Sequence, residues 1–173
     1  MSENLKFICD RMLGKLVTWL RIFGYDTLYA GDLEFEDENF GNSKIDEDRV
    51  LVNKFKDRIL LTKDRELYRL AKKSGRAAIL ITSDQVLTQI KQLVATLGVK
   101  TEPVMNRCSV CNTVLRKPSK DEILEFMKKE GIKEDLEKKY DLWYCEKCKK
   151  LYWMGSHWKN MKRFIDELKK FRA

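Results

Sequence analysis

The chain of 173 residues, 43% of them hydrophobic, is long enough to form one domain with a small appendage around a buried core. No apolar run approaches the roughly 20 residues that span a bilayer, and the N-terminus lacks the apolar segment of a signal peptide, which excludes a membrane protein and predicts a cytoplasmic one. Residues 1–104 carry 17 basic and 16 acidic side chains, whereas residues 105–173 carry 18 and 11, so a surplus of +7 lies in the C-terminal part.

That surplus predicts a polyanionic partner, of which nucleic acid is the simplest. If four cysteine thiolates bind one zinc ion, the C-terminal part still carries a charge near +5. The alternative is a lysine-rich solvated surface, as in proteins from hot habitats, and composition does not separate the two.

The N-terminal part predicts alternating strands and helices. Its first strand is the apolar run LKFICD, which ends at Asp10, and the helix that follows over residues 11–23 stops at Gly24. Further strands are expected over residues 26–30, 58–62 and 77–81, and further helices over about 45–55, 64–73 and 85–98. Because continuous apolar strands between helices form parallel sheets covered on both faces, the sequence predicts an α/β fold.

Acidic side chains follow the ends of three predicted strands. Asp10 and Asp64 each lie at the end of an apolar strand and Asp84 lies just past a third, and parallel strands end at one common edge of the sheet. The first turn of the second predicted helix adds Asp46 and Asp48, of which one should point inward. Crowded carboxylates raise one another's pKa unless a hard cation neutralises them, which predicts Mg²⁺ or Mn²⁺ between Asp10 and Asp64.

An alternative explains the same aspartates without a metal. Asp10 and Asp64 each stand immediately before a predicted helix or at its start, where a carboxylate accepts hydrogen bonds from backbone N–H groups. Spacing alone therefore leaves a metal site and simple helix capping equally open.

Two Cys-x-x-Cys turns stand beyond a boundary that we predict near Pro103, dividing the chain into residues 1–104 and 105–173. Four thiolates are the ligand set of a structural zinc ion in a zinc ribbon, and here they would be Cys108, Cys111, Cys145 and Cys148. The 33 residues between the two turns exceed the usual spacing, and their composition predicts a helical insertion.

Other roles for these cysteines are less favoured by the pattern. Disulfides fit poorly with a chain expected in the cytoplasm, and an iron–sulfur cluster stays open although paired turns flanked by short strands favour zinc. Cys9 lies within the first strand and is expected to be buried rather than a ligand. His157 follows a complete ligand set, so packing or helix capping is its expected role.

Basic and aromatic residues interleave around the second turn. Its aromatic side chains can stack on unpaired bases or build the core of a small ribbon; they are Trp143, Tyr144, Tyr152, Trp153 and Trp158. The predicted RNA contacts are Lys147, Lys149 and Lys150 near this turn, with Arg11 and Lys15 on the polar face of the first helix.

Four segments in order, CDRMLGKLVTWLRIFGYDT, RILLTKDREL, RCSVCN and YCEKCKKLYWMGSHW, resemble the Mut-seven C-terminal RNase domain family. The resemblance covers nearly the whole chain. It implies a PIN-like nuclease domain with a three-layer parallel sheet, followed by a small zinc ribbon with a C-terminal helix. It also places Asp10 and Asp64 on the family's acidic positions, with Asp46 as the helix acid and Asp48 as its alternative.

The activity expected from these features is metal-dependent hydrolysis of RNA phosphodiester bonds, with zinc as a structural ion and Mg²⁺ or Mn²⁺ as the catalytic one. Carboxylates would hold a cation that activates water, so no side-chain nucleophile is needed. The alternative is a non-catalytic RNA- or ribosome-binding protein, with rRNA as one partner and structural acids. A toxin nuclease of a toxin–antitoxin pair would share the chemistry, but its usual form lacks a zinc ribbon.

Overall fold

The computed structural model describes residues 5–33 and 44–172, without side chains at 44–46 and 172. The side chain of Asp46 therefore lies outside the described residues. The chain separates into two compact units, one formed by Met1–Leu20 and Tyr25–Lys100 and the other by Arg21–Gly24 and Thr101–Ala173. The division into a nuclease domain and a zinc ribbon at residue 104 stays a prediction.

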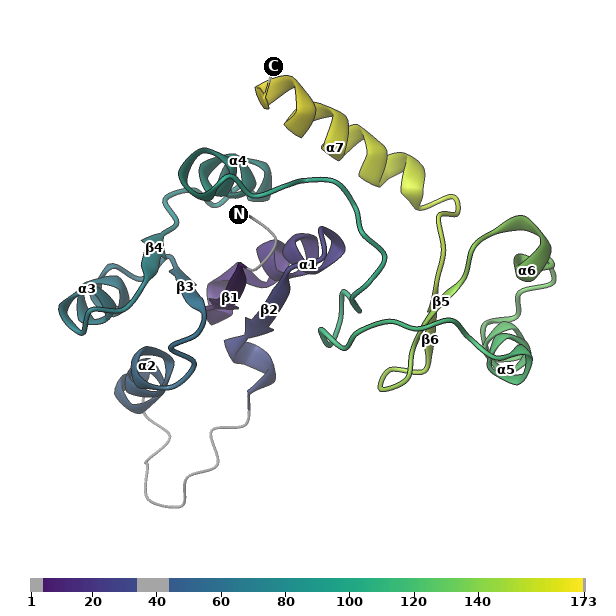
Figure 1. Ribbon diagram of the computed structural model, residues 1–173, viewed down its shortest axis with the longest axis horizontal. Coiled ribbons are helices and arrows are strands. Elements are labelled where there is room, and N and C mark those ends of the chain that lie inside the picture. The colour runs from purple at the N-terminus through teal and green to yellow at the C-terminus, as the bar shows by residue number, and fades with distance from the viewer. Residues whose placement is uncertain (1–4, 34–43, 173) are drawn as a thin grey trace. The chain divides into compact units, whose positions relative to one another are not determined.

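The first unit alternates strands and helices along the chain. Its elements are β1 (Lys6–Cys9), the 3₁₀ helix η2 (Arg11–Leu13), α1 (Gly14–Ile22), β2 (Asp26–Tyr29), the 3₁₀ helix η3 (Ala30–Asp32), α2 (Lys44–Asn53), β3 (Ile59–Thr62), α3 (Arg65–Lys73), β4 (Ala78–Leu80) and α4 (Val86–Leu97). The strands lie in the order β2-β1-β3-β4, and every pairing is parallel (Figure 1). The predicted α/β fold with a parallel sheet is confirmed.

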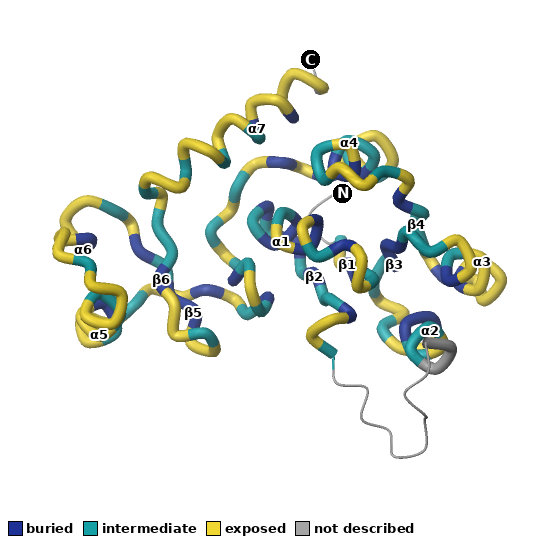
Figure 2. The backbone as a smooth tube through the Cα atoms, turned by 180° about the vertical axis from the view of Figure 1, so that it is seen from behind, coloured by how far each residue is buried: buried dark blue, intermediate teal, exposed yellow. Residues whose placement is uncertain are grey.

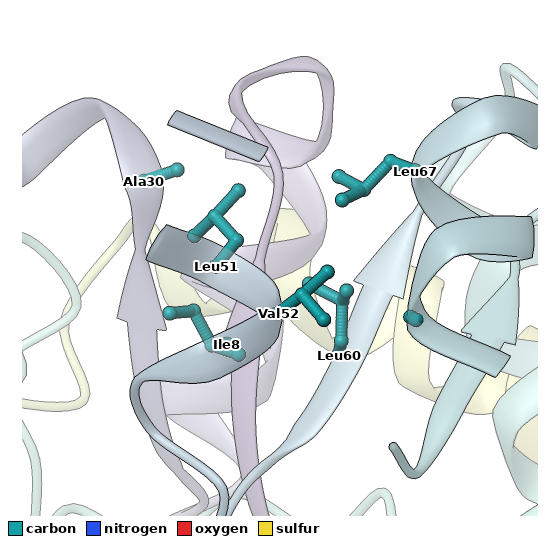
Figure 3. Close-up of a cluster of buried hydrophobic side chains, with 7 residues drawn as sticks. Ile8, Ala30, Leu51, Val52, Leu60 and Leu67 are labelled. Atoms are coloured by element: carbon teal, nitrogen blue, oxygen red, sulfur yellow. The ribbon is translucent and has the colours of Figure 1, made fainter. Parts of the chain in front are cut away.

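Successive residues of a strand point to opposite sides of the sheet. Because consecutive residues of the central strands β1 and β3 are apolar, both faces of the sheet are apolar. Ile8 and Leu60 pack with residues of the helices on one face, in a cluster that also holds Ala30, Leu51, Val52, Leu67 and Ala71 (Figure 3). The alternate residues Phe7 and Leu61 are also fully buried, on the face toward α1 and α4, while α2 and α3 lie on the first (Figure 1). Helices therefore cover both faces, and the PIN-like form of this layering stays a prediction.

Exposure follows the same arrangement. The strands are buried or intermediate along most of their length, whereas α3 presents an exposed outer surface (Figure 2). None of the described helices combines the length and the apolar composition required to cross a membrane.

Two helix boundaries differ from those predicted. α2 ends at Asn53 instead of Phe55, because Phe55 has a left-handed backbone with φ 56°, which an α-helix cannot accommodate. The helix expected from residue 11 begins as a 3₁₀ turn before α1, and the Asp10 side chain caps that turn by accepting the Arg11 N–H. Short-range capping thus fixes where the first helical segment starts.

The second unit contains the predicted helical insertion and two short strands. Its elements are α5 (Lys120–Glu130), α6 (Leu136–Lys139), β5 (Trp143–Cys145), β6 (Lys150–Tyr152) and α7 (Trp158–Arg172). β5 and β6 pair antiparallel, with Tyr144 opposite Leu151. These two side chains form a buried cluster with residues of the insertion, namely Ile123, Leu136 and Leu142. The inserted segment therefore contributes to the core of the unit.

Candidate functional site

The four cysteines predicted as zinc ligands come together in the second unit. Their sulfur atoms all lie within 4.8 Å of one another, with 3.8 Å between Cys108 and Cys148 and 3.5 Å between Cys111 and Cys145. Tetrahedral zinc with Zn–S bonds near 2.3 Å separates its sulfurs by about 3.8 Å. The cluster could therefore hold a zinc ion, and among the described side chains, those of residues 5–33 and 47–171, no other group of three or more potential ligands gathers in this way.

The two turns share one local geometry. In each, the backbone N–H of the second cysteine donates to the sulfur of the first: Cys111 to Cys108 over 3.4 Å, and Cys148 to Cys145 over 3.3 Å. Hydrogen bonds to a thiolate favour its charged form, and they orient the sulfur toward the shared centre. Each turn is thus built to present its sulfurs to a cation.

Residues outside the cysteine pattern fix the backbone around these turns. Arg21, at the end of α1, is 3% exposed and donates through Nη1 to the carbonyl oxygens of Val110 at 2.6 Å and Ser109 at 3.3 Å. Asn112 and Lys149, which each follow a second cysteine, have left-handed backbones with φ 70° and 50°. Arg21 was not among the predicted site residues, because its partners Ser109 and Val110 lie 88 and 89 positions further along the chain.

The pKa values of three of the four thiols are shifted, and not all in the same direction. Burial raises the pKa of Cys145 and Cys148. Burial also pushes the pKa of Cys111 upward, but hydrogen bonds with Thr113 and with neighbouring cysteines outweigh that effect and lower its pKa to about 6. The Tyr152 hydroxyl lies 3.0 Å from the Cys108 sulfur, and burial raises the pKa of that tyrosine. Because zinc binds thiolates, metal binding at this cluster releases protons.

Two further residues raised by the sequence lie outside the cluster. Cys9 is fully buried in β1, as predicted. His157 is exposed and immediately precedes α7, where its carbonyl accepts the Met161 N–H at 3.5 Å. It belongs to the start of the helix and not to the group of four cysteines.

The predicted acids of the first unit follow two adjacent strands. Asp10 comes directly after β1, and Asp64 comes two residues after β3, which pairs with β1. The chain leaves β1 for β2 on one side, whereas β3 lies on the other, so the strand order reverses between β1 and β3. Open α/β sheets bind ligands outside the carboxyl ends of the strands at such a switch point.

Thr62 connects these two aspartates. Its buried hydroxyl donates to Asp10 Oδ2 over 2.9 Å and accepts the Asp64 N–H over 2.9 Å. The Asp10 N–H in turn donates to the Leu61 carbonyl at 3.0 Å. The sequence analysis proposed both aspartates as site residues but not the threonine. A signal was present, because side chains two residues apart in an extended segment, such as Thr62 and Asp64, point to the same side.

Helix capping is also present. Asp64 Oδ1 accepts the Glu66 N–H at 2.8 Å and the Leu67 N–H at 3.2 Å, and Asp10 Oδ1 accepts the Arg11 N–H at 2.6 Å. The alternative drawn from spacing is therefore confirmed as a structural role. It does not compete with cation binding, because every carboxylate oxygen has two lone pairs.

Of the acids in the first turn of α2, Glu47 contacts the segment that follows β1. Arg11 Nε donates to both of its carboxylate oxygens, at 2.8 and 3.1 Å, and this hydrogen bonding raises the pKa of Arg11. Asp48 is half-buried and forms no three-carboxylate group with Asp10 and Asp64 among the described side chains. The choice between Asp46 and Asp48 as inward-facing acid stays a prediction.

The remaining predicted residues are at the surface. Asp84 has a side chain that is 90% exposed and forms an ion pair with Lys63. The predicted RNA contacts are all exposed, namely Arg11, Lys15, Lys147, Lys149 and Lys150. Exposure leaves these side chains available to a ligand, and their roles in catalysis or RNA binding stay predictions.

One comparison with known proteins identifies a relationship. The model of the Mut7-C RNAse domain family matches residues 5–165, which include both aspartates and all four clustered cysteines. No match is found among curated proteins or among solved structures.

Proposed function

Because the chain belongs to the Mut7-C RNAse domain family, we propose that it is a metal-dependent ribonuclease that hydrolyses phosphodiester bonds at the carboxyl edge of its parallel sheet. The observation that carries this proposal is the juxtaposition of Asp10 and Asp64 through the Thr62 hydroxyl at the switch point of the sheet. Membership of the family supports the proposed class of reaction, and the pair of carboxylates supports the proposed location of the site.

The donor set suits a hard divalent cation. Carboxylate oxygens are the ligands that Mg²⁺ and Mn²⁺ prefer, and Asp10 and Asp64 supply them from two neighbouring strands. When bound, such a cation lowers the pKa of a water molecule and offsets the negative charge of the transition state. No residue of the chain then has to act as a nucleophile.

The chain's own groups would orient the acids and the substrate. Thr62 fixes the Asp10 carboxylate by donating to Oδ2, and the first turn of α3 fixes Asp64 by donating to Oδ1. Arg11 directly follows Asp10 on η2 and Lys15 lies in the first turn of α1, and the charges of these exposed side chains suit a phosphate next to the scissile bond. Asp46, Asp48 and Asp84 are proposed as further catalytic acids, and the cysteine cluster as a structural zinc site that stabilises an RNA-binding ribbon.

A second candidate function is a non-catalytic RNA- or ribosome-binding protein. The contacts that the acidic side chains already make within the protein favour it, because they give these acids structural roles. Asp64 caps α3, Asp84 pairs with Lys63, and Glu47 pairs with Arg11. The surplus of +7 in residues 105–173 suits either function, since both require a polyanionic partner.

Incubation of the full chain with end-labelled single-stranded RNAs, with Mn²⁺ or Mg²⁺ and without either, separates the two candidates. Shortened products that form only with the divalent cation support the ribonuclease. RNA that is bound but stays intact with both cations, across substrates of different sequence, would instead support the non-catalytic protein.

A further inference from the structure

A pocket of about 260 Å³ opens in the second unit, and none of its lining residues is a cysteine. It lies between the end of α6 and the start of β5, and its lining residues are Met105, Lys139, Tyr140, Asp141, Trp143 and Met154. Pockets for drug-sized ligands and whole cofactors occupy roughly 300–1,000 Å³. This one therefore suits a single planar group and not a complete cofactor.

Two aromatic residues of the pocket are anchored in different buried clusters. Trp143 packs against the cluster around Cys108 and Cys145, and its strand pairing places it opposite Tyr152. Tyr140 packs against the cluster built by the insertion, and its backbone N–H caps α6. Rings held in this way lose little conformational freedom when a ligand stacks on them.

Positive charge lies directly beside the rings. The Lys117 ammonium stands 4.1 Å from the centre of the Trp143 ring and 3.8 Å from Asp141. Lys139, which lines the pocket, pairs with Glu134 at 2.6 Å, and both side chains of that pair are exposed. Exposed ion pairs contribute little free energy, so either lysine can exchange its carboxylate for a phosphate.

From these contacts we propose that the pocket takes one unpaired nucleobase of single-stranded RNA, with Lys117 and Lys139 meeting the adjoining phosphates. The inference rests on the proposed function, since it assigns to the second unit a defined contact with the ribonuclease substrate. A nucleobase is planar and stacks on aromatic rings whatever its identity, while the lysines supply the charge that its backbone requires.

The same features disfavour other occupants. A methylated lysine would suit an aromatic cage, but here it would meet the Lys139 ammonium group that lines the pocket, with the Lys117 ammonium group already over the Trp143 ring. An RNA duplex keeps its bases stacked inside the helix, so it cannot place one in the pocket without losing pairing. Single-stranded RNA fits both the volume of the pocket and the positive charge of the lysines beside it.

The test uses an eight-nucleotide single-stranded RNA that carries 2-aminopurine and a terminal fluorescein, in buffer without Mg²⁺ or Mn²⁺. Stacking on Trp143 should quench the 2-aminopurine emission, and Trp143→Leu should remove the quenching and weaken binding by about tenfold. Trp143→Phe, which keeps a ring, should retain most of the affinity. Leu124→Ala, which changes an exposed apolar side chain of α5 outside the pocket, should behave as wild type.

A second variant guards against loss of the fold, because Trp143 packs beside the cysteine cluster. Met154 is 47% exposed and lines the pocket, so Met154→Glu should place a carboxylate beside the bound RNA without disturbing the core. It should weaken binding while zinc content and melting temperature stay unchanged. Unchanged affinity and unchanged quenching in folded Trp143→Leu and Met154→Glu would overturn the pocket assignment.

The outcome is separable from that of the ribonuclease proposal. If wild-type protein quenches 2-aminopurine through Trp143 but cleaves no RNA with Mn²⁺, the pocket assignment is supported and the ribonuclease proposal is refuted. If wild-type protein cleaves RNA with Mn²⁺ but the Trp143→Leu variant binds RNA as tightly as wild type, only the pocket assignment is refuted. Wild-type protein that binds no single-stranded RNA would overturn the pocket as well.

Discussion

The hydroxyl of Thr62, fully buried at the end of β3, donates a hydrogen bond of 2.9 Å to Asp10 Oδ2 at the end of β1. The same oxygen accepts the Asp64 N–H. One hydroxyl group therefore fixes a carboxylate of one strand and the backbone that carries the carboxylate of the next.

Thr62→Val keeps the shape of this side chain and removes both hydrogen bonds. Two polar groups lose their partner, so we expect the free energy of unfolding to fall by about 1–3 kcal/mol. Cleavage should fall by about 10- to 100-fold, as when other groups that orient metal ligands are removed. Thr62→Ser, which keeps the hydroxyl, is the matched control. Wild-type cleavage by folded Thr62→Val would show that this hydrogen bond is structural only.

Asp64→Asn separates helix capping from metal binding. The amide oxygen can still accept the Glu66 and Leu67 N–H groups, so the fold should persist. A neutral amide neither balances a cation nor replaces a carboxylate, so divalent-dependent cleavage should fall by about 100-fold or more. The measurements are cleavage of several RNAs with Mn²⁺ and thermal melts with and without metal. Cleavage at the wild-type rate would remove Asp64 from the active site.

The cysteine cluster predicts about one tightly held zinc ion per chain. Cys145→Ser should abolish zinc binding and unfold the second unit, whereas the sheet of the first unit should keep its circular dichroism signal. Cys9→Ala changes a buried cysteine outside the cluster and should leave the zinc content intact. Elemental analysis of purified protein measures the ratio, and wild-type protein with two disulfides and no metal would refute the zinc site.

The lysines around the second turn predict salt-dependent RNA affinity. Each phosphate contact adds about −0.7 to the slope of log affinity against log salt for a single strand, so replacing Lys147, Lys149 and Lys150 by alanine should reduce the slope by about 2. Lys72 and Lys73, at the end of α3, offer a control pair whose replacement should have less effect. Equal slopes for the two variants would assign the phosphate contacts elsewhere.

Glu122 predicts a pH effect on the second unit. Its hydrogen bonds with Arg116, and then with the Ser119 backbone, lower its pKa from the ordinary value to about 2. A carboxylate with a depressed pKa stabilises the fold above its unfolded pKa, near 4.3, and that contribution is lost as pH falls toward 2. Glu122→Gln should thus melt lower than wild type at pH 6, and the difference should shrink between pH 5 and 2. A difference independent of pH would exclude the charge as its cause.

Sequence patterns predicted the local features of this chain well. The apolar runs predicted the strands of the sheet, and the two Cys-x-x-Cys turns predicted the cysteine cluster. Both patterns consist of residues that are close together in the sequence. Asp10 and Asp64 were proposed as site residues from the same kind of pattern, since each lies at the end of an apolar strand.

The contacts that complete the sites were not predictable in this way. Arg11 pairs with Glu47 across 36 positions of the chain. Which acid of α2 faces the proposed site depends on the rotation of that helix, and the sequence pattern left this open between Asp46 and Asp48. The pocket beside Trp143 likewise requires α6 and β5 to be placed first. Such relationships follow from strand order and helix packing, which are properties of the whole unit.

The distance between the two turns gives the zinc site a further consequence. A metal ion shared by Cys111 and Cys145 would close a ring that contains the 33 intervening residues, with α5 and α6 inside it. For a covalent cross-link, a loop of that size lowers the entropy of the unfolded chain by an amount worth about 4 kcal/mol. The insertion would then behave as a cyclic peptide, so that a single protease cut within it would leave both cut ends tethered through the ion.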